Sequence, residues 1–155
     1  MAPVPARTWK FSDICIATLL LAVALFGLFY IGIAEFRWRD YTAPPLMGFG
    51  PHRWDLAGVI EAVVRSIAGL VALLSLFLFR RHPRLSLTLG IASALAAAAT
   101  NAYRIYDDVT AWAPFGAGAL DVTHPFVMID TLICVVLLAW LGVRAASECA
   151  RSGSG

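Results

Sequence analysis

The stretch from Ile14 to Ala34 constrains the fold of this chain more than any other feature. It contains 21 residues without an acidic or basic side chain, and about 20 apolar residues in a helix cross the hydrocarbon core of a bilayer. Arg7 and Lys10 precede it, as basic residues do in signal peptides. The apolar stretch is longer than a signal peptide needs, however, and no small-x-small cleavage site follows it. We therefore expect a retained first membrane span.

Three more apolar segments follow, at residues 56–79, 85–103 and 126–143. The 155 residues are 60% hydrophobic and 14% charged, whereas soluble domains are about 45–50% apolar and about 25% charged. A soluble domain of this composition would have too little polar surface to cover its apolar core. A protein surrounded by lipid needs no such polar surface. We predict an all-α fold, a polytopic four-helix bundle that forms a single transmembrane domain over residues 1–155. Residues 150–155 are expected to be a flexible tail or a cloning remnant.

The distribution of basic residues between the loops predicts the orientation. Seven basic residues fall on one side of the membrane, and four fall on the other. Because cytoplasmic loops carry the excess of Lys and Arg, both termini are expected in the cytoplasm, with the protein in the plasma (inner) membrane. The seven are Arg7, Lys10, Arg80, Arg81, Arg84, Arg144 and Arg151. The four are Arg37, Arg39, Arg53 and Arg104.

Two long segments, residues 35–55 and 104–124, are predicted to be loops on the outer face. Both contain aromatic residues, which favour the headgroup zone, and Pro and Gly, which oppose long helices. An interfacial cap is one interpretation, and a docking surface for a partner protein is the other. The tryptophans available for partner packing are Trp38, Trp54 and Trp112.

Polar residues inside the spans form the main candidate site. They comprise two acids, two bases and one amide, all in the outer third of the membrane: Glu61, Arg65, Asn101, Arg104 and Asp130. An isolated charge at depth costs about 2.5–3.5 kcal/mol, so these residues are expected to form one connected network. The network is either structural, or a pocket for a headgroup, quinone or substrate, or a proton or ion path. The path is disfavoured because no charged residue continues the line toward the cytoplasmic half.

The third span carries a stripe of small residues that includes Gly90, Ala94 and Ala97. Small side chains let neighbouring helix backbones approach closely. The stripe is therefore expected to face either the centre of the bundle or a helix of a partner protein.

Signals for metal binding and catalysis are weak. His52 and His124 are candidate metal ligands, but they lie in separate loops without a ligand spacing, so no metal site is predicted. The three cysteines show no paired spacing. No nucleotide-binding or nucleophile motif occurs, so no catalytic residue is assigned. The net charge of +2 favours no nucleic-acid partner.

Three features of residues 56–143 follow one another: an acid and a base early in the second span, a basic turn with proline, and a small-residue third helix with a polar end. The residues concerned are Glu61, Arg65, residues 80–84, Asn101 and Arg104. This order resembles small four-span membrane proteins of the DoxX-like kind. Members of that group are associated with quinone-linked oxidoreductase systems, so the resemblance implies contact with a quinone or a lipid. The aromatic segment after the first span departs from the pattern.

Two functional hypotheses follow from the sequence. The first, which the small size and the missing catalytic motif favour, is a non-catalytic accessory subunit of a larger membrane complex for transport or electron transfer, or a homo-oligomer. The second is a protein that binds a quinone or lipid in an outer-leaflet polar pocket and takes part in redox or lipid metabolism.

Overall fold

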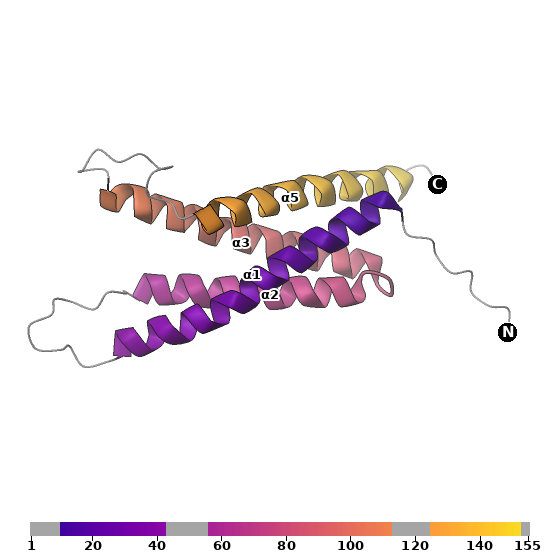
Figure 1. Ribbon diagram of the computed structural model, residues 1–155. Coiled ribbons are helices and arrows are strands. Elements are labelled where there is room, and N and C mark those ends of the chain that lie inside the picture. The colour runs from indigo at the N-terminus through magenta and orange to yellow at the C-terminus, as the bar shows by residue number, and fades with distance from the viewer. Residues whose placement is uncertain (1–9, 43–55, 113–124, 153–155) are drawn as a thin grey trace, which may run out of the picture.

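The computed structural model describes residues 10–42, 56–112 and 125–152, and nearly all of these residues are helical (Figure 1). Each of the four helices is long and apolar enough to cross a membrane. Within these residues, the predicted all-α class with four helices long and apolar enough to span a membrane is therefore confirmed. The helices are α1 (Phe11–Thr42), α2 (Leu56–Leu78), α3 (Pro83–Trp112) and α5 (Pro125–Ser152).

Three helices continue beyond the ends that hydropathy predicted. The first was expected to end at residue 34, the third at 103 and the last at 143, whereas they end at Thr42, Trp112 and Ser152. Charged residues end an apolar stretch without ending a helix, and (i, i+4) ion pairs such as Glu35–Arg39 stabilise the added turns. At 1.5 Å per residue, α1 is about 48 Å long, well beyond the roughly 30 Å of the hydrocarbon core.

The prediction that residues 35–55 and 104–124 are loops is consequently wrong for the first part of each segment. Trp38 lies on the last turns of α1, where its side chain is exposed and its ring is 6.2 Å from that of Tyr41. Trp112 is the last residue of α3. Trp54 lies outside the described residues.

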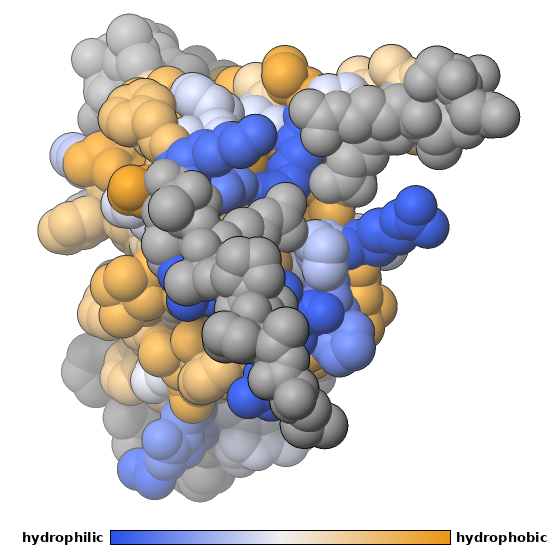
Figure 2. Space-filling view, turned by 90° about the vertical axis from the view of Figure 1, so that its right-hand side faces the viewer, coloured by the Kyte–Doolittle hydropathy of each residue, from blue (hydrophilic) through white to orange (hydrophobic). Residues whose placement is uncertain are grey.

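The first residue of α1, Phe11, and the last residue of α5, Ser152, lie at the same end of the bundle as the turn between α2 and α3 (Figure 1). An ion pair of 3.0 Å between Asp13 and Arg144 ties this end together, and the Arg144 guanidinium lies 4.9 Å from the centre of the Phe79 ring. Figure 2 views this end and shows hydrophilic side chains on it, with hydrophobic side chains around the flanks. The exposed basic residues here are Lys10, Arg80, Arg81 and Arg84.

Helices α1 and α2 touch backbone to backbone where Gly27 meets Gly69. A Cβ atom built on Gly69 would lie 2.5 Å from the Cα of Gly27, and one built on Gly27 would collide with the Cα of Gly69. Such close crossings need small residues, because dispersion and backbone contact replace the hydrophobic effect inside lipid. Between the start of α1 and this crossing, the core is filled by Ile16, Leu20 and Val23.

Serine hydroxyls join α2 to α3. Ser75 Oγ donates to the Ser86 carbonyl at 2.7 Å, and Ser86 Oγ donates to the Ser75 carbonyl at 2.8 Å. Ser93 Oγ donates to the Ala68 carbonyl at 2.8 Å. Each hydroxyl is thus satisfied inside the bundle, as lipid requires.

The Gly27–Gly69 crossing can be tested with one added methyl group. Gly27→Ala is expected to destabilise the bundle by about 1–3 kcal/mol, the usual cost of overpacking, because the methyl group collides with Gly69. Gly32→Ala is the control on the same helix, since nothing lies within 4 Å of its Cβ position. Thermal unfolding in mild detergent, followed by circular dichroism, measures both. Equal midpoints for the two variants would contradict the close crossing.

Candidate functional site

A buried ion pair joins α2 to α5. Arg65 donates to Asp130 through Nε at 2.9 Å and through Nη2 at 2.6 and 2.7 Å, so the guanidinium engages both carboxylate oxygens. The two side chains are 0% and 2% exposed. Bidentate Arg–carboxylate pairs of this kind are short and strong. The pair neutralises two charges that neither helix could bury alone.

The other helices also contribute to this pair. The Asn101 amide of α3 donates to Asp130 Oδ2 at 3.0 Å, and Arg65 Nη1 lies 3.4 Å from the Val23 carbonyl of α1. The Tyr30 ring of α1 is 5.9 Å from the guanidinium carbon, within the range of a cation–π contact. Side chains or carbonyls of all four helices therefore meet at one cluster, which we call the central triad after Arg65, Asp130 and Asn101.

A second buried ion pair holds the outer half of α1 against α2. Arg37 Nη1 donates to Glu61 Oε2 at 2.5 Å and to the Gly58 carbonyl at 2.6 Å. The Arg37 and Glu61 side chains are 6% and 3% exposed. Arg37 was assigned to an outer loop from the sequence, because the first span was taken to end at Ala34. Hydropathy gave no signal for this pair, because Arg37 lies beyond the end of the apolar stretch.

The five predicted network residues are therefore placed in three groups rather than one. Arg65, Asn101 and Asp130 meet in the central triad, whereas Glu61 pairs with Arg37. Arg104 pairs with Asp108 one turn along α3, at 3.2 Å.

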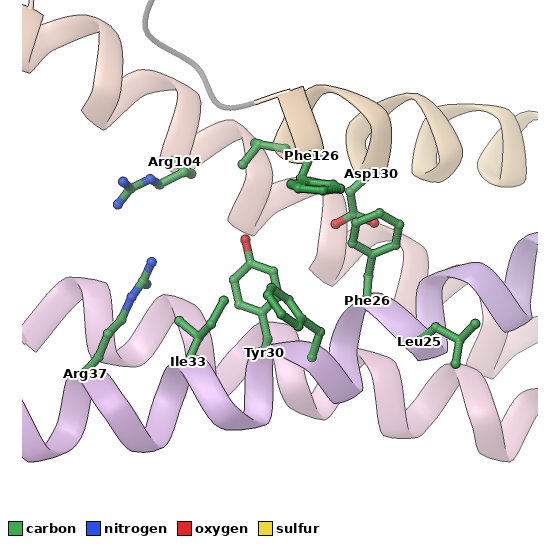
Figure 3. A pocket seen from close by; sticks show the side chains of 10 residues that line it. Leu25, Phe26, Tyr30, Ile33, Arg37, Arg104, Phe126 and Asp130 are labelled. Atoms are coloured by element: carbon green, nitrogen blue, oxygen red, sulfur yellow. The ribbon is translucent and has the colours of Figure 1, made fainter.

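A pocket of about 630 Å³ lies beside the central triad, between α1 on one wall and α3 and α5 on the other (Figure 3). Most of its lining is aliphatic or aromatic, and four polar side chains interrupt it. Ligand sites typically combine such a lining with a volume of about 300–1,000 Å³. The apolar residues are Leu25, Phe26, Phe29, Ile33, Phe126 and Val127, and the polar ones are Tyr30, Arg37, Arg104 and Asp130.

The small residues of α3 lie inside the bundle. Gly90 is buried, and Ala94 and Ala97 are each 0% exposed. A Cβ atom built on Gly90 would be 3.2 Å from Ser75 Oγ and 3.3 Å from Leu141 Cδ1. Of the two expectations for this stripe, the structure fits packing at the centre of the bundle and gives no exposed surface for a partner helix at these three residues.

The weak metal candidates His52 and His124 lie outside the described residues. Within residues 10–42, 56–112 and 125–152, no group of three potential ligands among His, Cys, Asp and Glu comes together. Cys134 Sγ is buried, 4.0 Å from Asp130 Oδ1.

No protein-family model matches the chain, and no curated protein or solved structure matches it. The DoxX-like resemblance stays a prediction.

The central triad is expected to be a main determinant of stability. Asp130→Asn keeps the side-chain shape but leaves Arg65 buried without its counter-charge, which typically costs about 3–5 kcal/mol. The double variant Arg65→Met/Asp130→Leu removes both charges and should be more stable than Asp130→Asn alone.

Unfolding in detergent micelles measures both variants against Glu35→Gln. Glu35 belongs to an exposed pair with Arg39, so its loss should change the midpoint little. A double variant less stable than Asp130→Asn would show that the triad does more than neutralise its own charges.

Proposed function

We propose that this chain is an integral membrane protein that binds an amphipathic small molecule, a membrane lipid or a quinone, in the pocket between α1, α3 and α5. The pocket itself carries the proposal. It combines a long apolar wall with a few convergent polar side chains, as sites for such molecules do. The DoxX-like resemblance, which implies contact with a quinone or lipid, supports the same class of ligand.

The rim of the pocket favours a ligand that arrives from the bilayer. Leu25, Phe29 and Phe126 line the pocket and are 58%, 68% and 63% exposed. In a membrane-crossing segment, exposed apolar side chains face lipid. A hydrophobic molecule can therefore pass between α1 and α5 without crossing water.

The accessory-subunit hypothesis remains a second prediction without structural support of its own. It relied in part on Gly90, Ala94 and Ala97 as a surface for a partner helix, and these residues are buried within the chain. Its remaining basis is the small size, the absence of a catalytic motif and the aromatic residues of the outer segments, of which Trp38 is exposed.

Filling the pocket tests the proposal. Ile33 lines the pocket, so Ile33→Trp should displace a bound lipid or quinone. Ile31→Trp is the matched control, because Ile31 is 44% exposed on the same helix and is not part of the lining. Native mass spectrometry after gentle extraction from membranes should find a bound amphiphile on the unmodified protein and on Ile31→Trp, but not on Ile33→Trp. An unmodified protein without such a ligand, or equal retention by both variants, would refute the proposal.

We further propose that both termini are cytoplasmic in the plasma membrane, which puts the pocket in the outer leaflet. The exposed basic residues at the end shown in Figure 2 support this orientation. Cys149 is exposed on the last turns of α5. A membrane-impermeant maleimide should therefore label it only after the cells are permeabilised.

Thr42→Cys supplies the opposite control, in a background where Cys15 and Cys149 are serine. Thr42 is the last residue of α1 and is exposed, so this variant should be labelled in intact cells. Labelling of Cys149 in intact cells, with Thr42→Cys labelled only after permeabilisation, would show the opposite orientation.

A further inference from the structure

We infer that the ligand of this pocket is an anionic amphiphile, whose acidic head lies between Arg37 and Arg104 and whose hydrocarbon chain runs along α1 toward Leu25. The inference rests on the proposed binding function and specifies the chemistry of the ligand.

Two guanidinium groups, one from each wall, line the outer part of the pocket. Arg37 extends from α1 toward the opposite wall, whereas Arg104 runs along its own helix α3, where it pairs with Asp108 (Figure 3). Each guanidinium has a carboxylate partner, and both groups attract an anion placed between them. The planar guanidinium fork also matches the oxygens of a phosphate or a carboxylate.

The acids that pair with these arginines offset part of their charge but lie outside the lining of the pocket. Glu61 and Asp108 accept from Arg37 and Arg104, but neither is part of the lining. Asp130 does line the pocket, yet its side chain is 2% exposed and is engaged by Arg65 and Asn101. A ligand therefore meets cations at this end of the pocket, above all Arg104, whose side chain is 24% exposed.

Polarity changes along α1 in the same sense as along a lipid molecule. Arg37 stands at the outer end of the pocket, followed by Ile33 and Tyr30, and then by Phe26 and Leu25 toward the middle of the helix. Arg37 and Leu25 are separated by about 18 Å along the helix axis. A lipid of the adjacent leaflet has its head toward the membrane surface and its chains toward the centre, so it fits the pocket without turning over.

Neutral quinones lack the charge that this arrangement selects. A quinone would use the apolar wall and could accept hydrogen bonds from the arginines, but it would gain no charge pairing. Phosphate and carboxylate share the required chemistry and come from different sources, an acidic phospholipid and a free fatty acid. The experiment separates the two.

The test measures binding of four probes to the purified full chain in neutral detergent by native mass spectrometry. The probes are phosphatidylglycerol, phosphatidylcholine with the same chains, oleate and a ubiquinone. Phosphatidylglycerol or oleate, or both, should bind at least about tenfold more tightly than phosphatidylcholine and the quinone, because the difference is a charge-assisted contact. Tighter binding of phosphatidylglycerol than of oleate identifies a phospholipid, and the reverse identifies a fatty acid.

Arg104→Gln should reduce binding of the preferred anion by about tenfold while binding of phosphatidylcholine changes little. Arg104→Lys keeps the charge without the fork and should retain part of the affinity. Arg39→Gln is the matched control: Arg39 is also an arginine with an (i, i+4) acid, on the last turns of α1, but it does not line the pocket. If Arg104→Gln does not fold, the ratio of anionic to zwitterionic binding on the unmodified protein decides the question alone.

The outcomes distinguish this inference from the proposed function. The four probes could bind equally, or the quinone could bind most tightly. If Ile33→Trp abolishes that binding, the result overturns the anionic ligand and leaves the pocket as a binding site. Anion binding that Arg39→Gln weakens as much as Arg104→Gln also overturns the inference, because it reveals general surface attraction. Binding that Ile33→Trp does not affect places the ligand elsewhere and overturns both.

Discussion

The ion pair between Arg65 and Asp130 is the interaction on which the arrangement of the helices depends. Neither charge can be exposed to lipid at acceptable cost, so α2 and α5 must present them to each other. Once they do, the remaining lone pair and donor positions are directed at α3 and α1, where Asn101 and the Val23 carbonyl lie. A van der Waals interface between apolar helices tolerates small changes in register, whereas a bidentate pair with a third partner tolerates few. The central triad thus specifies which faces of the helices meet.

The position of α1 follows from two further contacts with α2. The Gly27–Gly69 crossing brings the two backbones together near the middle of the helices, and the Arg37–Glu61 pair holds the outer half of α1 to the start of α2. Both contacts draw α1 toward α2. In its outer half α1 consequently lies apart from α5 (Figure 1).

Hydropathy alone predicted four spans and placed the intramembrane polar residues, because charges within apolar stretches are conspicuous. It did not predict the pairs. Glu61 and Arg65 were expected to belong to one connected network, yet Glu61 bonds to Arg37 and Arg65 bonds to Asp130. A one-dimensional pattern reports which side chains share a face and not which helix lies opposite. Arg37 was missed for a related reason: the end of an apolar stretch was taken as the end of a helix, although α1 continues to Thr42.

From the sequence, a structural polar network and a ligand pocket stood as competing interpretations of the same residues. The structure relates them instead. Arg37 is fixed by Glu61, and Asp130 by Arg65 and Asn101, and each also lines the pocket. The partners that hold these side chains do not line the pocket, so the orientation of the side chains does not depend on a ligand. Such preorganisation lowers the entropic cost of binding. The contacts that draw α1 toward α2 also open the gap toward α5 in which the pocket lies. Charge neutralisation between the helices and the formation of the pocket therefore depend on the same contacts among the helices.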